Sequence, residues 1–582
     1  MNTWGKLGSG VGAATLVFGI YLAAEARPAG ETNNASVDAV FADYSKPGAP
    51  GCALAVYRDG KIVYAKGYGQ ANIEENVAIT PQSVFDIGST SKQFTAASIL
   101  LLEKQGKLSV NDDVRKYIPE LPDYGQKITI LHLLNHTSGL RDYLALIELA
   151  GINVDSVTTD EDALQLVVRQ KALNFAPGSD FLYSNTGFFL LSTIVKRVSG
   201  KTLREFATEN IFQPLGMTHT QYRDDHTLLI PKRALAYDPK EHGDAFALNV
   251  SYFEQTGDGA VHTSVEDLLK WDENFYSGQV GGKDFLAEIQ EHGKLNSGKV
   301  LEYAKGLFIQ DYRGLPTVSH GGAWGGYRAE LLRFPEQHFS VACLCNRSDA
   351  NPTKKAHGVA DIYLAKLLKP AEKQASATDS NGPGVALTEA QLKPLAGNYR
   401  DPNKGTLIRI SAKEQKLMAE VFGQRAELRA MSATEFVPGS LPVDLRFIFE
   451  PATNGTTKKL RITGLAELAA VYDALPDYAP NSAELAAYAG DYASDELGVS
   501  FRLGMVGEKL KLVAMLDPSG LERSGGIPRN ELKPVLVDEF EIGGTPVTIH
   551  FTRDKARGIA GFTLDAGRTK GMIFARHAPA GQ

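Results

Sequence analysis

Cysteine is scarce in this chain: Cys52, Cys343 and Cys345 are the three cysteines among 582 residues. So few cysteines exclude a scaffold held together by a network of disulfides. Cys343 and Cys345 would share one face of a strand, which is a poor geometry for pairing with each other, and Cys52 lies far away in the sequence. We therefore expect all three to act as small buried hydrophobic residues.

Neither positive nor negative charge is in large excess. The net charge of -7 is mild for this length and the sequence has no basic stripe, so we expect no nucleic-acid partner. Hydrophobic residues make up 43% and charged residues 22%, as in ordinary soluble globular proteins. A chain of 582 residues is too long for one core, and its length predicts three or four domains.

Long hydrophobic runs are lacking apart from one near the start. Residues 1–26 combine a positive Lys6, a mostly apolar stretch at residues 11–24 and the small-residue pattern AEA at residues 24–26. This pattern predicts a cleaved signal peptide. The apolar stretch is shorter than the roughly 20 residues that span a membrane. We expect a periplasmic or secreted protein without stable membrane insertion after cleavage; an uncleaved anchor is the alternative.

Strand patterns at both ends of residues 35–368 bracket a helical middle. Residues 52–69 contain the turn Asp59-Gly60 between two apolar runs, and strand character returns at residues 327–346. Between them, helical periodicity is clearest at residues 93–105, 186–199 and 265–276. The pattern predicts an α+β domain in which an antiparallel sheet packs against helices.

A linker and two strand-rich repeats follow. Residues 369–386 are small, polar and contain proline and glycine, which is typical of a linker. The sequence LAGNY at residues 395–399 is echoed by YAGDY at residues 488–492. We expect two small antiparallel barrels or sandwiches, at residues 387–480 and 481–578. The second carries about eleven extra residues near 516–526.

The segment GSTSKQF at residues 88–94 places Ser89 three positions before Lys92. Helix capping would explain a serine at this position. However, a serine hydroxyl needs a partner that removes its proton before it can act as a nucleophile. A lysine at i+3 shares the helix face of the serine, and in partly desolvated surroundings it can serve as a base. Lys92 is therefore a candidate activator of Ser89.

Two further motifs fit the same chemistry. Tyr183 precedes a helix and could move a proton between Ser89 and a leaving group, while Asn185 offers an amide to the substrate or to the lysine. A turn with asparagine side-chain bonding is the alternative.

The third motif is His320-Gly321-Gly322. Its glycines would let backbone amides approach a developing oxyanion, and His320 could orient the substrate or, when protonated, bind a carboxylate. A glycine-rich entry into a strand is the alternative.

Together, Ser-x-x-Lys, Tyr-x-Asn and His-Gly-Gly resemble the motif set of the penicillin-recognising serine hydrolases. The segments LLNHTSGL at residues 133–140 and YSNTGFFLLSTIVKRVSG at residues 183–200 are similar to signature segments of the class C β-lactamase branch. The resemblance covers residues 35 to about 368 and implies a β-lactamase/DD-peptidase-like domain. It also implies individual roles: nucleophile for Ser89, general acid/base for Lys92 and Tyr183, substrate orientation for Asn185, oxyanion amides for Ser89 and Ala323, and a structural role for His136.

The chain departs from that branch at residues 320–322, where class C β-lactamases have Lys-Thr-Gly. The missing lysine charge and threonine hydroxyl weaken the case for holding a β-lactam carboxylate, and histidine versions resemble peptidases of the family. With two lipocalin-like eight-stranded barrels, the layout resembles bacterial D-aminopeptidases, in which a loop of the last barrel reaches the active site. By that resemblance, Asp517 and Glu522 would face a substrate ammonium.

We therefore expect a serine hydrolase that cleaves amide bonds through an acyl-enzyme, a D-aminopeptidase-like peptidase acting on D-amino-acid peptides or amides without a metal or cofactor. Alternatives are a D-Ala-D-Ala carboxypeptidase, an esterase or a weak class C β-lactamase, since the same machinery serves all of them. A non-catalytic protein that binds peptidoglycan fragments or small ligands is the alternative of another class. The expected partner is a small peptide or amide substrate. A homodimer is compatible with the sequence.

Overall fold

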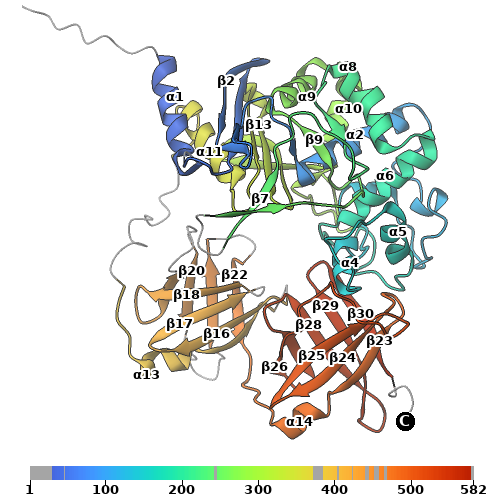
Figure 1. The fold of residues 1–582 in the computed structure, drawn as a ribbon, viewed down its shortest axis with the longest axis vertical. Coiled ribbons are helices and arrows are strands. Elements are labelled where there is room, and N and C mark those ends of the chain that lie inside the picture. Colours follow the sequence, from blue (N-terminus) through green and yellow to red (C-terminus); the bar gives the residue numbers. More distant parts are fainter. Residues whose placement is uncertain are drawn as a thin grey trace, which may run out of the picture.

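The computed structural model describes residues 29–44, 46–240, 245–370, 384–402, 405–421, 424–438, 445–450, 458–464 and 468–577. The predicted signal peptide and most of the predicted linker lie outside the described residues. Figure 1 shows a large domain of helices and sheet, here called the sheet-helix domain, above two bodies built of strands. Among the described residues, none of the helices has the length and apolar character that crossing a membrane requires.

A seven-stranded antiparallel sheet forms the centre of the sheet-helix domain, in the order β10-β11-β12-β13-β14-β1-β2. Its strands are β1 (Cys52–Arg58), β2 (Lys61–Tyr68), β10 (Tyr303–Ala304), β11 (Leu307–Tyr312), β12 (Leu315–Trp324), β13 (Tyr327–Phe334) and β14 (Phe339–Cys345). The hairpin near the start of the domain thus joins strands from its end, because β1 pairs with both β2 and β14. The predicted α+β fold is confirmed.

Helices cover both faces of this sheet. On one face α11 (Pro352–Tyr363) packs on β13 and β14, with α1 (Ala29–Val40) against α11. On the other, α9 (Val265–Ser277) packs on β1 and β14, while α2 (Lys92–Lys104) packs against α6 (Asn185–Ser199). The buried residues form a separate apolar cluster on each face.

Shorter elements complete this domain. The helices and helical turns are η1 (Ala42–Tyr44), η2 (Gly88–Ser91), η3 (Val114–Lys116), α3 (Ile130–Leu134), α4 (Tyr143–Leu149), α5 (Asp160–Val168), α7 (Leu203–Ala207), η4 (Thr208–Phe212), α8 (Gln213–Leu215), α10 (Gly282–Ile289) and η5 (Pro335–Gln337). The short strands are β3 (Gln70–Asn72), β4 (Val77–Ala78), β5 (Phe85–Asp86), β6 (Gln221–Tyr222), β7 (Ala236–Pro239), β8 (Phe246–Asn249) and β9 (Val261–Thr263).

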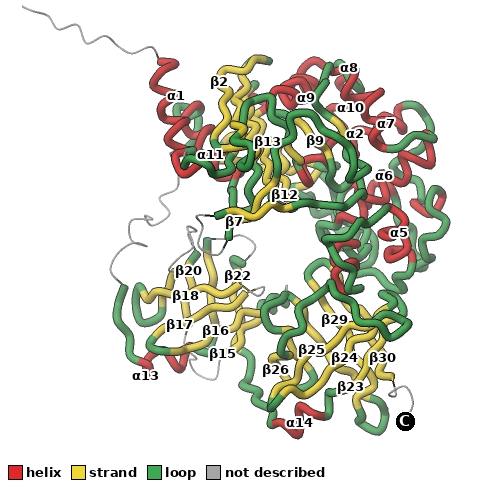
Figure 2. Tube along the Cα trace, in the orientation of Figure 1, coloured by secondary structure: helices red, strands yellow, loops and turns green. Residues whose placement is uncertain are grey.

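The two strand-rich bodies each contain eight antiparallel strands, and Figure 2 shows how little helix they carry. The first barrel closes in the order β15 (Gly397–Arg400), β16 (Leu407–Lys413), β17 (Lys416–Val421), β18 (Gln424–Ala430), β19 (Glu435–Pro438), β20 (Arg446–Glu450), β21 (Lys459–Thr463) and β22 (Ala470–Ala474). It is preceded by α13 (Glu389–Leu392) and η6 (Lys393–Leu395).

The second barrel is nearly closed. It follows α14 (Ser482–Ala486) and consists of β23 (Gly490–Ser494), β24 (Val499–Val506), β25 (Lys509–Leu516), β26 (Leu532–Leu536), β27 (Glu539–Ile542), β28 (Val547–Arg553), β29 (Ile559–Ala566) and β30 (Thr569–His577). Strands β25 and β26 meet at the seam, where the Leu512 N–H donates to the Asn530 carbonyl at 3.1 Å.

The repeated tyrosine motif has the same physical role in both barrels. Tyr399 in β15 and Tyr492 in β23 are wholly buried. A buried tyrosine hydroxyl needs a hydrogen-bond partner. Each donates to the carbonyl four residues earlier, that of Leu395 at 2.7 Å and that of Tyr488 at 2.8 Å. The motif therefore ties the first strand of each barrel to the turn that precedes it.

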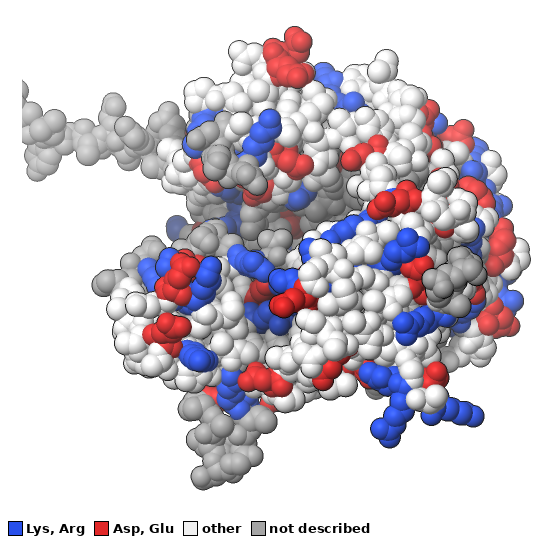
Figure 3. All heavy atoms as spheres, turned by 60° about the horizontal axis from the view of Figure 1, so that its bottom comes forward, with Lys and Arg blue, Asp and Glu red and all other residues white. Residues whose placement is uncertain are grey.

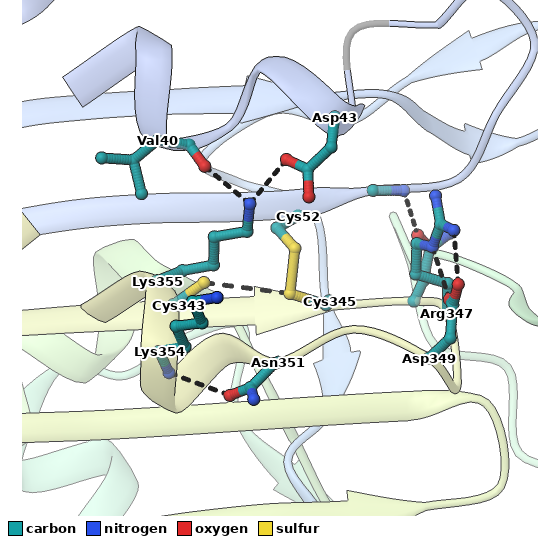
Figure 4. The surroundings of a disulfide bond; sticks show 12 residues. Val40, Asp43, Cys52, Cys343, Cys345, Arg347, Asp349, Asn351, Lys354 and Lys355 are labelled. Carbon is teal, nitrogen blue, oxygen red and sulfur yellow. Dashed lines mark hydrogen bonds and ion pairs between the residues drawn. A yellow bond between two sulfur atoms is a disulfide. The ribbon is translucent and has the colours of Figure 1, made fainter. Parts of the chain in front are cut away.

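The expectation that all three cysteines are small hydrophobic residues is wrong for two of them. Cys52 in β1 lies directly opposite Cys345 in β14, and the two form a disulfide (Figure 4). Strand pairing brings together residues 293 positions apart, which sequence separation could not reveal. Cys343 is the free, buried cysteine, with its sulfur 3.8 Å from that of Cys345.

The second barrel is anchored on the sheet-helix domain by a buried ion pair. Arg141 Nη1 lies 2.6 Å from Glu496 Oε2, and both side chains are almost wholly buried. Arg141 also donates to the carbonyls of Lys570 and Gly571, at the start of β30. Because a buried charge is costly unless it is paired and hydrogen-bonded, these contacts hold the β29–β30 turn against the sheet-helix domain.

Charged contacts also join the two barrels. Arg400 and Arg409 of the first barrel pair with Glu539 and Glu541 of the second, and Lys533 pairs with Glu420. In Figure 3 the surface is hollowed between the sheet-helix domain and the barrels, with Lys and Arg side chains along the barrel side.

Candidate active site

A tight turn presents Ser89. Strand β5 ends at Asp86, and η2 begins at Gly88, which has a φ of +47°. A Cβ at Gly88 would lie 2.7 Å from the backbone nitrogen of Ala323 in β12, so glycine alone allows this close approach. The Asp86 carboxylate accepts the Gly88 N–H at 2.7 Å. The turn is thus held from both sides, with Ser89 at its tip.

Lys92 lies wholly buried beneath this turn. Its Nζ donates to Ser89 Oγ at 3.0 Å, to Asn185 Oδ1 at 2.9 Å and to the carbonyl of Asp258 at 2.6 Å. An ammonium has three donors, which matches these three oxygens in number; as an amine the same nitrogen has two donors and one lone pair. Lys92 therefore joins η2, the start of α6 and the loop before β9 at one point.

Tyr183 lies beside this lysine. Its ring centroid is 5.0 Å from Lys92 Nζ and 4.1 Å from the ring centroid of His136. The Tyr183 hydroxyl is buried and has no hydrogen-bond partner among the described residues. His136 Nδ1 accepts the Ser184 N–H at 3.1 Å, and burial holds the pKa of His136 well below its ordinary value. A neutral His136 thus positions the loop that carries Tyr183.

His320 lies at the edge of the site in β12. Its Nδ1 is 2.6 Å from the Gly321 carbonyl oxygen, to which it donates, so Nε2 is left to accept from the Tyr303 hydroxyl at 3.3 Å. Burial, and then the charge of Lys92, lowers the pKa of His320 to about 3. With so low a pKa the ring is uncharged at neutral pH and would not bind a carboxylate as a cation, whereas a role of His320 in orienting the substrate stays a prediction.

These residues surround one cleft with a volume of about 830 Å³. Seven of the predicted site residues line it: Ser89, Tyr183, Asn185, His320, Gly321, Gly322 and Ala323. Lys92 lies behind them, and Asp86 and Asp258 form part of the wall. Burial raises the pKa of Asp86 to about 7 and that of Asp258 to about 6. A serine hydroxyl, a lysine, a phenol and an amide therefore meet at one open site.

The Beta-lactamase family model matches residues 37–365, more than half of the chain. The chain belongs to the Beta-lactamase family. It is a serine hydrolase. It is 29% identical to Penicillin-binding protein 4* of Bacillus subtilis over 67% of this chain and 88% of that protein. It is 28% identical to the D-aminopeptidase of Gluconobacter oxydans over 73% of this chain and 79% of that protein.

A solved structure is similar in fold to this Beta-lactamase family member. The octameric penicillin-binding protein homologue from Pyrococcus abyssi matches with a TM-score of 0.54 and 23% identity, over 76% of this chain and 99% of that chain. At this identity the likeness concerns the fold alone.

Residues 516–526, the insertion in the second barrel of this family member, do not place acidic groups at the cleft. The Asp517 carboxylate accepts hydrogen bonds from Ser519 and Leu521 within its own turn, and Glu522 is exposed beside it. Neither residue lines the cleft. The prediction that Asp517 and Glu522 face the substrate is therefore wrong.

The insertion packs on the sheet-helix domain instead. A Cβ added at Gly151 would lie 2.9 Å from the Cβ of Arg523, and one added at Gly526 would lie 2.7 Å from the Glu148 carbonyl. The extra residues therefore lie against the end of α4. Their length alone did not indicate which surface they contact.

The second barrel reaches the cleft through another segment, the turn between β29 and β30. Arg568 lines the cleft, and its guanidinium carbon lies 4.8 Å from the ring centroid of Tyr183. Its Nη1 is 3.9 Å from Oδ2 of Asp142, which also accepts the Asn185 N–H at 2.7 Å. Sequence reasoning missed both residues. Asp142 lies two residues after the signature segment at residues 133–140 and could have been included, whereas Arg568 has no local signal.

One cluster of metal-ligating side chains lies apart from the residues described above. Ligand atoms of Asp225, His226 and Glu254 lie within 4.8 Å of one another. His226 Nδ1 is 2.7 Å from Glu254 Oε1, and Asp225 accepts hydrogen bonds from Thr227. The sequence pattern did not reveal this cluster, and the contacts among its own members account for its arrangement.

Asp86 gives a prediction for the pH dependence of stability. Because burial raises its pKa to about 7 in the folded protein, folding favours its protonated form. The associated stability is present at low pH and is lost as the pH rises through about 7. Asp86→Asn keeps an oxygen for the Gly88 N–H but cannot ionise. We expect the variant to gain stability relative to wild type as the pH rises from about 5 to 8.

Urea denaturation at intervals across that pH range measures the difference. Asp155→Asn, at an exposed side chain, is the control and should show no comparable trend. A difference between Asp86→Asn and wild type that stays constant with pH would contradict the prediction.

Proposed function

We propose that this Beta-lactamase family member cleaves amide bonds in small peptides or amides that contain D-amino acids, through an acyl-enzyme on Ser89. The observation that carries the proposal is the hydrogen bond from the wholly buried Lys92 to the Ser89 hydroxyl, at a cleft that Tyr183 also lines. The relatives named D-aminopeptidase support the substrate class.

In the proposed reaction, one member of the Lys92–Tyr183 pair, the amine or the phenolate, acts as the base. Ser89 Oγ attacks the carbonyl carbon of the substrate while its proton passes to that member. The same pair returns a proton to the leaving nitrogen as the C–N bond breaks. Water then attacks the acyl ester and restores the serine. The Tyr183 hydroxyl is buried and has no hydrogen-bond partner among the described residues, and the proposed reaction requires it to contact the reacting groups when substrate is bound.

The oxyanion would be held by the backbone N–H groups of Ser89 and Ala323. Both residues line the cleft, and the turn at Gly88 passes directly against the Ala323 nitrogen. Preorganised backbone donors of this kind stabilise the charge that develops on the carbonyl oxygen during acyl transfer. Asn185, held by Lys92 and Asp142, would orient the substrate.

The neutral His320 argues for a peptidase or amidase over a β-lactamase. The lysine of the Lys-Thr-Gly motif would supply a fixed positive charge at this position, whereas burial keeps His320 uncharged at neutral pH. His320 would therefore offer no positive charge to the carboxylate of a β-lactam. An esterase shares the same machinery, and no contact in the site distinguishes it.

A D-Ala-D-Ala carboxypeptidase is the second candidate, because Arg568 places a cation at the cleft. A non-catalytic binding protein is disfavoured by the satisfied contacts of Lys92 with Ser89 and Asn185. The predicted homodimer stays a prediction.

We also propose export to the periplasm or the medium. The disulfide between Cys52 and Cys345 supports this location, since disulfides persist in oxidising compartments and are rare in the cytosol.

Two variants test the assignment of the nucleophile and the proton shuttle. Ser89→Ala removes the attacking oxygen, and we expect turnover to fall by more than about 10³-fold. Tyr183→Phe keeps the ring and removes the hydroxyl, and we expect a loss of about 10²- to 10⁴-fold in kcat. Tyr363→Phe, on α11, is the matched control and should keep wild-type rates. Wild-type activity in Ser89→Ala would refute the mechanism.

A substrate panel distinguishes the reaction classes. We expect D-Ala-p-nitroanilide or a D-Ala-D-Ala peptide to show a higher kcat/KM than nitrocefin and p-nitrophenyl acetate, and a higher one than L-Ala-p-nitroanilide. The relatives named D-aminopeptidase support the preference for D-residue amides, and an uncharged His320 disfavours nitrocefin. Faster turnover of nitrocefin would favour a β-lactamase, and faster turnover of the acetate ester would favour an esterase.

The export proposal predicts a processed and oxidised protein. Mass spectrometry of protein from the native host should show a chain that begins at Arg27, with one cysteine alkylated after unfolding without reductant and three after reduction. A chain that begins at Met1 and has three reactive cysteines before reduction would contradict the proposal.

A further inference from the structure

The carboxylates that line the cleft are all engaged by protein groups. Asp86 and Asp258 are buried; Asp86 accepts the Gly88 N–H and Asp258 accepts the Tyr143 hydroxyl at 3.1 Å. Asp349 pairs with Arg347 through two hydrogen bonds of 2.6 Å. Each acidic side chain among the described residues that line the cleft thus already accepts a hydrogen bond from the protein.

The arginines that line the cleft differ in whether their N–H groups donate hydrogen bonds to the protein. Arg223 donates to the carbonyls of Ser251 and His226, and Arg328 donates to those of Gly325 and Tyr327. The guanidinium of Arg568 donates no hydrogen bond to any residue that the structure describes. It is also partly open to solvent, with 46% of its side chain exposed. A guanidinium carries five N–H donors in a planar fork, and Arg568, which lines the cleft, has no hydrogen-bond acceptor for them among the described residues.

The position of Arg568 is held by contacts of its backbone. Its carbonyl accepts the Asn174 side-chain amide at 2.9 Å and the Asp142 N–H at 3.4 Å. Two residues further on, Arg141 binds the carbonyl of Lys570. The turn is therefore fixed on the sheet-helix domain, and its guanidinium lies over the ring of Tyr183.

The nearby Asp142 does not saturate this guanidinium. The separation of 3.9 Å is too long for a hydrogen bond, and the two carboxylate oxygens of Asp142 already accept the N–H groups of Leu144 and Asn185. Asp142 consequently does not occupy the N–H donors of Arg568, although its negative charge offsets part of the positive charge of the guanidinium.

We propose that Arg568, supplied by the second barrel, binds a carboxylate on the leaving-group side of the scissile amide. A guanidinium recognises a carboxylate through two parallel hydrogen bonds. Tyr183, which in the proposed function passes the proton to the leaving nitrogen, lies directly beneath Arg568. Because of this contact, we assign the carboxylate that Arg568 binds to the leaving group. The inference rests on the proposed function and names its substrate class: peptides whose residue after the scissile bond ends in a free carboxylate.

Matched substrates test this assignment on the full chain. The pair is N-acetyl-D-Ala-D-Ala and its C-terminal amide, which differ in the terminal charge. We expect wild type to prefer the acid, and Arg568→Ala to lose about tenfold or more in kcat/KM on the acid, mainly through KM, with little change on the amide. Arg568→Lys should recover part of the loss, because it keeps the charge without the fork.

Lys570→Ala is the matched control, since it removes a positive charge from the same turn at a side chain that does not line the cleft. It should leave both substrates unchanged. Thermal unfolding of each variant shows whether the second barrel stays docked. Equal losses on acid and amide, or no acid preference in wild type, would overturn the proposal; equal losses would mean that Arg568 acts on Tyr183.

Binding to Ser89→Ala separates this inference from the proposed function. Calorimetry of the acid and the amide, with and without Arg568→Ala, measures recognition in the absence of chemistry. Tighter binding of the acid that disappears with Arg568→Ala would support the inference even if wild type hydrolysed neither peptide. Equal affinities for acid and amide would overturn it even if both peptides were hydrolysed.

Discussion

The active-site architecture depends on one buried side chain, that of Lys92. A charged group excluded from water is tolerated only where protein acceptors replace its hydration. Those acceptors come from three separate segments: Ser89 in η2, Asn185 at the start of α6, and the carbonyl of Asp258 before β9. Satisfying the lysine therefore brings the nucleophile and the substrate-orienting amide to fixed positions. The requirement is structural and chemical at once, because the same contacts that remove the cost of burial assemble the site.

The second barrel extends this assembly beyond the sheet-helix domain. Arg141 anchors the barrel, and its neighbour Asp142 accepts the N–H of Asn185 while lying close to Arg568. Two adjacent residues thus connect the docking contact with the site. A change at the barrel interface would act on Asn185 and on the cation above Tyr183 through this short path. The barrel is for that reason part of the site and more than an appended module.

Sequence predicted those parts of the site that depend on local geometry. Ser89 and Lys92 share a helix face because they are three residues apart, and the repeated tyrosine motif marks the first strand of each barrel. The Cys52–Cys345 disulfide and the position of Arg568 depend on which strands and domains meet, and no short segment encodes that. The same reason explains the error at Asp517: the length of an insertion is visible in sequence, but the surface on which it packs is not. The low pKa of His320 could not be predicted from the sequence, because its burial is a tertiary property.

His320 and Arg568 together indicate how the charge of the site is arranged. Where the family resemblance implies a lysine on β12, this chain has a histidine that burial keeps neutral. The cation whose N–H donors have no acceptor in the part of the chain that the structure describes comes instead from another domain, above Tyr183. A positive group on β12 would be fixed within the sheet, whereas Arg568 is present only while the second barrel is docked. Electrostatic recognition of substrate is thereby coupled to the Arg141–Glu496 contact. The buried lysine can hold Ser89 in place without the barrel, but the charge selectivity that we infer depends on it.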